Sequence, residues 1–390
     1  MKKFVYLCGM MLLSMNMMAQ IDLYDQNWYT ILNENFDQSG RYWIDTSFLS
    51  SDSVWKAYSG GLTHGNADYH SKMIYQYSQC HFNDVDGYME LVAEYDDEGR
   101  IPEHDYDLPY TVSDYPDYTD LYYFSGMINH HDRLGKEYAK YKYGYFEIRC
   151  KLPIHPGAFP AFWLWDAKDN QYYEEIDIFE FSWEYEDSLM MGWHSPNPHG
   201  AGYPYCFTSG IYYCDTANYC GRETSRARVY PMINDSLSHW HTFSCEWMPE
   251  HILWYCDGHL VDGYHNPDSI PHHPLTLKAN YAIDRYALKN HNNDSLPEWK
   301  ESDKMVIDYI KVYQLNWNCD TDEIITQQSD LSGFDFAVKK SITIASTIEP
   351  VNVGSTDKVT FRATDSFEIT GPFEVGSGGE LTVIMQQCPE

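Results

Sequence analysis

The sequence is short of basic residues. Its 390 residues include 26 Lys and Arg against 58 Asp and Glu, which gives a formal net charge of −32. Binding to nucleic acid or to an anionic lipid surface needs a basic footprint, which this composition does not supply. We therefore expect no nucleic-acid partner.

Long apolar runs are missing beyond the N-terminus, so no membrane span is expected. The first residues have the form of a secretory signal peptide: a basic start at Lys2 and Lys3, an apolar stretch over 4–18, and the small Ala19. The alternative is a buried N-terminal helix. We predict a signal peptide over residues 1–19, which makes the chain secreted, periplasmic or exposed on the outer surface of a bacterium.

Closely spaced cysteine pairs of the CxxC type, which would indicate a zinc or redox site, are also missing. Ten cysteines are present, and nine remain once Cys8 leaves with the signal peptide. Because nine is odd, at least one thiol is free or pairs between chains. Cys245 and Cys256 lie symmetrically about a turn and are expected to face each other as a disulfide or as two buried thiols, with the buried pair preferred.

After residue 319 the chain has no Trp, Tyr or His. Residues 341–345 and 381–384 alternate as strands, and glycines mark turns between them. We predict a small β-rich module over 318–390, closed by a Cys319–Cys388 disulfide. Such a module is better suited to support or surface attachment than to sugar stacking. It resembles short C-terminal β segments of exported proteins from Bacteroidetes-type bacteria.

Residues 20–317 lack long amphipathic helical periodicity and carry every Trp and His of the chain and every Tyr except Tyr6. Short strand patterns recur instead, with turn signals such as Asp257-Gly258 between them. The expected strands are 145–150, 175–181, 241–247, 252–256 and 305–313. Many short strands in about 300 residues predict an all-β sandwich or jelly roll. The 35 Tyr, 12 Trp and 17 Phe of the chain suit a large core or a long binding cleft.

The candidate chemistry lies in the segment EIDIFE that begins at Glu175. Strand alternation places Glu175 and Asp177 on one face and the two isoleucines on the other. Plain alternation would send Glu180 to the apolar face, so a β-bulge of one extra residue is expected to return it to the acid face. Glu174 lies on the opposite face and is not counted with these three.

Three carboxyls in a row are electrostatically costly unless they share protons or take part in a reaction. Glycoside hydrolysis needs two such carboxyls flanking the scissile bond, about 5–5.5 Å apart when the anomeric configuration is retained. The alternative is an acidic edge strand, where charge prevents aggregation. Aromatic residues at 157–165 and 192–194 favour the sugar cleft, because apolar sugar faces stack on rings.

These motifs resemble glycoside hydrolase family 16, the laminarinase, lichenase, agarase and carrageenase group. The resemblance covers roughly residues 28–315. It rests on the acid motif, on Pro160-Ala161-Phe162-Trp163, and on the later segments 246–258 and 307–313 in their order. It implies an all-β fold: a jelly-roll sandwich of two antiparallel sheets with a concave cleft, followed here by the small C-terminal β module.

The resemblance also implies roles for individual residues. Glu175 would be the nucleophile, Glu180 the general acid/base and Asp177 the assisting acid of a retaining endo-hydrolase. The substrate-binding residues would be Trp163, Trp193 and His194. No cofactor would be required, but some members hold a structural calcium on the convex side, which would make Asp308 a metal ligand. We expect a monomer that acts on a polysaccharide.

The sequence specifies the polysaccharide substrate less closely than it specifies the catalytic residues. Phe159 stands where many β-1,3-glucanases have Trp, and the residues after the acid motif depart from the common laminarinase continuation. The strongly negative charge weighs against sulfated polymers. A β-1,3- or mixed β-1,3/1,4-glucan is expected. The alternatives are an agar-type β-galactan, or a non-catalytic carbohydrate-binding protein on the same sandwich, against which the intact acids argue.

Overall fold

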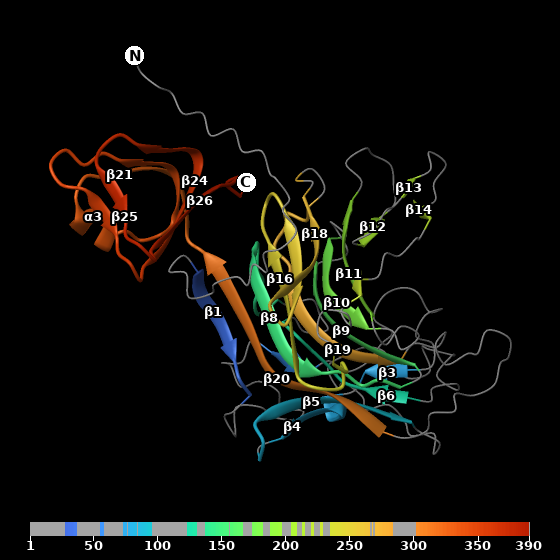
Figure 1. Cartoon of the computed structure of the whole chain (residues 1–390). Coiled ribbons are helices and arrows are strands. Elements are labelled where there is room, and N and C mark those ends of the chain that lie inside the picture. Colours follow the sequence, from blue (N-terminus) through green and yellow to red (C-terminus); the bar gives the residue numbers. More distant parts are fainter. Residues whose placement is uncertain are drawn as a thin grey trace.

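The structure is a computed structural model in which nearly every regular element is a strand (Figure 1). It describes residues 28–36, 55–57, 73–95, 123–130, 137–166, 174–181, 188–196, 204–208, 213–214, 220–221, 227–228, 235–283 and 302–389, apart from positions 76, 84, 156, 266 and 268–269. The predicted signal peptide lies outside the described residues. No helix in the described ranges is long and apolar enough to cross a membrane.

One 10-stranded sheet has the order β18-β17-β16-β8-β20-β5-β6-β3, with β1 paired to β20 and β4 to β5. Its strands are β1 (Trp28–Glu34), β3 (Met73–Tyr75), β4 (Cys80–Asn83), β5 (Tyr88–Tyr95), β6 (Tyr123–Ser125), β8 (Gly144–Lys151), β16 (His241–Trp247), β17 (Ile252–Cys256), β18 (His259–Tyr264) and β20 (Ser302–Leu315). A short 3-10 turn, η1 (Tyr77–Gln79), precedes β4. All pairs are antiparallel except β3 with β6.

An 8-stranded sheet packs against it in the order β12-β11-β10-β9-β19-β7-β2, with β15 paired to β11. Its strands are β2 (Lys56–Ala57), β7 (Met127–Asn129), β9 (Ala158–Trp165), β10 (Glu175–Phe181), β11 (Ser188–Pro196), β12 (Pro204–Thr208), β15 (Ala227–Arg228) and β19 (Thr276–Ile283). A separate ribbon joins β13 (Tyr213–Cys214) to β14 (Cys220–Gly221). The prediction of an all-β sandwich is confirmed.

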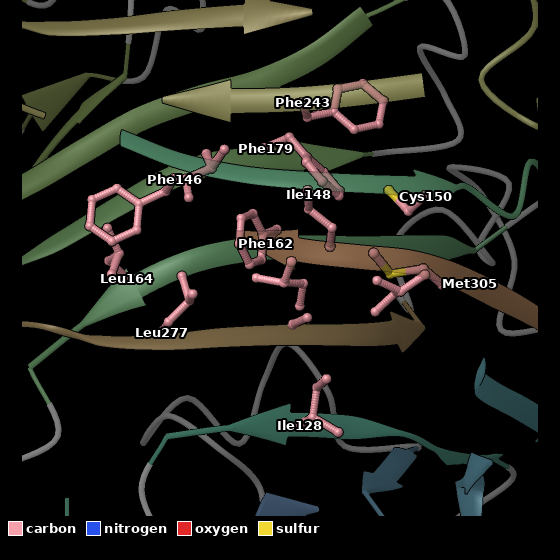
Figure 2. Close-up of a cluster of buried hydrophobic side chains, with 14 of the residues drawn as sticks. Ile128, Phe146, Ile148, Cys150, Phe162, Leu164, Phe179, Phe243, Leu277 and Met305 are labelled. Atoms are coloured by element: carbon pink, nitrogen blue, oxygen red, sulfur yellow. The ribbon is translucent and has the colours of Figure 1, made fainter. Parts of the chain in front are cut away.

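The core lies between the two sheets, where every second residue of each strand points inward. Figure 2 shows this layer, with side chains from β7, β8, β9, β10, β16, β19 and β20 meeting in one cluster. On β8, Phe146, Ile148 and Cys150 are completely buried, while Glu147 and Arg149 between them are half-exposed. This alternation is what the period-2 pattern of the sequence predicts. On β8 it leaves the outer face of the 10-stranded sheet to polar residues.

The predicted turn at Asp257-Gly258 connects β17 to β18, and both residues have positive φ, at 49° and 75°. Two successive residues in this conformation make the tight turn whose twist matches a β-hairpin. The hairpin before it, β16–β17, differs from prediction. Cys245 lies opposite Trp254, and Cys256 lies opposite Phe243, so the two cysteines are not cross-strand partners. Both are buried free thiols, as preferred.

The C-terminal module has its own small core (Figure 1). Its elements are β21 (Trp317–Ile325), α3 (Gln328–Ser332), β22 (Val338–Ile344), β23 (Val351–Val353), β24 (Lys358–Ile369), β25 (Phe373–Val375) and β26 (Glu380–Met385). The strands pair in parallel, whereas β3 with β6 is the one parallel pair among the described strands of the sandwich. The predicted Cys319–Cys388 disulfide is present. The exact boundary at residue 318 stays a prediction.

Candidate active site

The acid motif forms strand β10, and its register contains the predicted bulge. Against β9, Asp177 pairs with Trp163 and Phe179 with Phe162, so Ile178 is one residue too many on the β10 side. Beyond the bulge, Glu180 pairs with Ala161. Paired residues of antiparallel strands share a face. Glu175, Asp177 and Glu180 therefore all lie on the face of Trp165, Trp163 and Ala161, which we call the acid face.

The burial of β10 agrees with this register. Ile176, Ile178, Phe179 and Phe181 are completely buried in the core between the sheets. Glu175 and Glu180 are half-buried, and Asp177 between them is only 2% exposed. The bulge thus uses two successive apolar residues to fill the core and still brings the second glutamate back to the acid face. The two accessible carboxyls lie on either side of a buried one.

A bulge interrupts the backbone ladder, so its polar groups need other partners. The carbonyl oxygen of Asp177 accepts a hydrogen bond of 2.9 Å from the indole Nε1 of Trp254. Trp254 comes from β17 in the opposite sheet and is completely buried. A core tryptophan therefore stabilises the bulge backbone from the core side of the sheet. The sequence pattern did not reveal this role.

Strands β9 and β19 extend the acid face sideways. Thr276, Lys278 and Asn280 of β19 pair with Trp165, Trp163 and Ala161 of β9. The indole Nε1 of Trp163 donates a 2.7 Å hydrogen bond to the side-chain Oδ1 of Asn280. Trp163 is 6% and Asn280 5% exposed, so this bond fixes the ring beside Asp177. Trp163 thus lies beside Asp177, and its contact with substrate stays a prediction.

Lys278 is the residue of this face that sequence reasoning missed. It is 1% exposed, with its Nζ 3.8 Å from the ring centre of Trp165 and 4.3 Å from that of Trp163. Burial lowers the pKa of Lys278 to about 7, and the negative charge of Glu175 opposes that shift. A single lysine gives no sequence signal of its own, because only the pairing of β19 with β9 brings it to the acid face.

Trp193 and His194 are placed by their backbones on β11. His194 pairs with Glu175, whereas Trp193 pairs with Ile176, whose side chain lies in the core. The register therefore favours His194 as the position on the acid face. Substrate contact by either residue stays a prediction, since their side chains lie outside the described part of the structure.

Asp308 lies on β20 in the other sheet. Its carboxylate forms an ion pair with the guanidinium of Arg149 on β8. Glu34 of β1 pairs with Ile310 on the same strand. A calcium ion at Asp308 would have to compete with Arg149, and this site stays a prediction.

Residues 135–311 match the family model described as Glycosyl hydrolases family 16, and this range contains all seven predicted site residues. Endo-1,3-1,4-beta-glycanase ExsH of Rhizobium meliloti is 28% identical over 194 residues, covering 50% of this chain and 34% of that protein. Glucan endo-1,3-beta-glucosidase A1 of Niallia circulans is 26% identical over 209 residues, covering 49% and 26%. The chain thus matches only about a third or less of the length of these relatives.

Among solved structures, LamAcat from Zobellia galactanivorans superposes with a TM-score of 0.50 at 18% identity, covering 73% of this chain and 97% of that one. At this level of identity the similarity supports the sandwich fold alone.

Proposed function

We propose that the chain, whose residues 135–311 match the model of glycosyl hydrolases family 16, is a secreted, retaining endo-hydrolase of a β-linked glucan. The observation that supports this most is the bulged strand β10, which puts two accessible glutamates on one face around a buried aspartate. Hydrolysis of a glycosidic bond needs two carboxyls of this kind. The names of the relatives, which include mixed-linkage and β-1,3-glucan enzymes, favour a glucan.

In the proposed reaction Glu180 begins protonated and gives its proton to the leaving glycosidic oxygen. The carboxylate of Glu175 attacks the anomeric carbon and forms a covalent glycosyl ester as that bond breaks. Glu180 then removes a proton from water, which displaces Glu175 from the sugar. Two inversions at one carbon give net retention.

The surroundings of the two glutamates fit these roles. Asp177 is nearly inaccessible, so it acts on its neighbours through hydrogen bonding and charge rather than by touching bulk solvent. The indole of Trp163, held by Asn280, lies beside the acids, and its small exposed part would be the apolar contact for a sugar ring. The Lys278 ammonium attracts the Glu175 carboxylate from the same face.

The deciding experiment measures reducing ends released from β-1,3-glucan, mixed β-1,3/1,4-glucan and agarose. We expect release from one or both glucans, and a first product with retained anomeric configuration by NMR. Release from agarose alone would move the assignment to β-galactan. Binding without release from any polymer would refute the enzyme, and an inverted product would refute the double displacement.

Export is part of the same proposal. N-terminal sequencing of the chain recovered outside the cytoplasm is expected to start at Gln20, directly after the predicted cleavage site. A mature chain that keeps residues 1–19 would contradict it.

A further inference from the structure

Three metal-ligating side chains meet next to the acid strand. Glu174 directly precedes β10, while His272 and His273 lie in the segment before β19. The Glu174 carboxylate is completely buried. Its Oε2 accepts hydrogen bonds from the backbone N–H groups of His272, at 3.1 Å, and His273, at 2.7 Å. These two bonds fix the plane and direction of the carboxylate, and they leave Oε1 pointing at the imidazoles.

The second oxygen of Glu174 is the unusual one. Oε1 lies 3.2 Å from Nδ1 of His272 and 3.1 Å from Nδ1 of His273. Despite these short distances, no donor among the described residues makes a hydrogen bond to this buried oxygen. A buried carboxylate oxygen left in this way is costly.

A metal ion bound by these three side chains would give the buried Glu174 oxygen a partner. One ligand atom from each of the three residues lies within 4.8 Å of the others. In a tetrahedral zinc site with bonds of 2.0–2.1 Å, ligand atoms are about 3.3 Å apart, close to the two oxygen–nitrogen distances of Glu174. The backbone bonds to Oε2 supply the outer support that ligating carboxylates normally have. Two imidazoles and a carboxylate are suitable ligands for zinc and other divalent first-row transition metals, whereas calcium and magnesium prefer all-oxygen sites.

We propose that Glu174, His272 and His273 bind a zinc-class divalent cation, with the fourth position open to solvent beside the exposed His272. The ion would tie the start of β10, one residue before Glu175, to the segment that leads into β19 and Lys278. Its role would be to hold these two strands of the acid face together. It is separate from the calcium predicted at Asp308, which lies on the other sheet.

The test uses the full mature chain, stripped with EDTA and titrated with zinc chloride by calorimetry. We expect one zinc per chain with a dissociation constant of about 1 μM or tighter, and a higher unfolding temperature with zinc than without. Cobalt at the same site is expected to give the visible absorption of tetrahedral coordination, while calcium is expected to leave the unfolding temperature unchanged.

His272→Ala is the variant least able to disturb folding, because this side chain is 60% exposed. It is expected to weaken zinc binding at least ~10-fold, as is Glu174→Gln. Asp308→Asn is the matched control and is expected to bind zinc like the unaltered chain. Absence of saturable zinc binding, or binding that both cluster variants leave unchanged, would overturn the proposal, whether or not the chain hydrolyses glucan.

Discussion

At the scale of single residues, the acid face combines groups that the sequence reveals with groups that it hides. Glu175, Asp177 and Glu180 stand out because acidic and apolar residues alternate around them. Lys278 and Asn280 do not stand out, since they are polar residues of one short strand that carries no acid motif. Their positions beside Trp163 follow from the pairing of β9 with β19.

Replacing the proposed nucleophile gives the most direct residue-scale prediction. Glu175→Gln keeps the size and half-buried position of the side chain but cannot attack the anomeric carbon. We expect glucan hydrolysis to fall by at least ~1,000-fold, with an unchanged circular dichroism spectrum and retained glucan binding. A variant that hydrolyses at the original rate would rule out Glu175 as the nucleophile.

Lys278 predicts a pH-dependent stability. Its pKa is lowered to about 7 in the folded chain, against about 10.4 in an unfolded chain. Between these values the unfolded state binds the additional proton, so the free energy of unfolding rises with pH across that window. Below about pH 7 both states are protonated and the full cost of burying the charge is present.

Lys278→Met removes this buried charge at similar side-chain length. We expect it to raise the unfolding temperature at pH 6 by roughly 2–5 °C. This increase in unfolding temperature is expected to become smaller as the pH rises to 10. Lys340→Met, in the C-terminal module and exposed, is the control and is expected to show no such trend. A gain at pH 10 as large as at pH 6 would contradict the assignment.

At the scale of elements, the bulge in β10 is the feature on which the site depends. Its existence could be predicted, because a strand that must keep two glutamates on one face and fill the core with Ile178 and Phe179 needs one extra residue. Its support could not be predicted, because Trp254 comes from the other sheet, 77 residues later. The misplaced Cys245–Cys256 pair has the same origin: cysteine spacing does not specify a hairpin register.

Trp254→Phe tests the support of the bulge. It removes the hydrogen bond to the Asp177 carbonyl and leaves that buried group unsatisfied, at a cost of about 1–3 kcal/mol. We expect lower stability and, because the bulge positions Glu180, a fall in kcat larger than any change in KM. Urea unfolding and steady-state kinetics measure the two effects.

Trp247→Phe is the matched control, since the Trp247 indole is also completely buried and donates a 2.9 Å bond to a backbone carbonyl, that of Pro271. It is expected to lose comparable stability while keeping kcat close to that of the unaltered chain. Equal losses of kcat in the two variants would show that Trp254 acts through general stability alone.

At the scale of the whole molecule, the sandwich and the C-terminal module have separate cores but share a contact. A third apolar cluster brings Trp28, Tyr145 and Tyr255 of the 10-stranded sheet together with Val338 of β22. The hydroxyl of Tyr29 also donates to the backbone oxygen of Asp335. The composition break near residue 318 predicted a module there but not this contact, which joins residues about 300 positions apart.

The disulfide gives the molecular-scale prediction. Cys319 and Cys388 are 69 positions apart, and closing a loop of that length is worth about 4 kcal/mol in the chain-entropy model. The double variant Cys319→Ser, Cys388→Ser is expected to make the module unfold or be cut by protease under milder conditions, while glucan hydrolysis persists. Dithiothreitol is expected to reproduce this in the unaltered chain and to add nothing in the variant. Loss of hydrolysis together with the module would contradict the expectation that the sandwich works without the module.

The sequence by itself determined the features that depend on neighbours along the chain: the strand periodicity, the acid row with its bulge and the Asp257-Gly258 turn. The Cys319–Cys388 disulfide was predicted because these two cysteines lie at the two ends of the C-terminal module. Only the tertiary structure decided which distant residues share a face or a cluster. Glu174 contacts His272 and His273, which lie 98 and 99 positions later in the sequence. Lys278 and Glu175 share a face because β9 pairs with both β19 and β10. Strand order and register depend on how whole sheets pack, and no local pattern of residues carries that information.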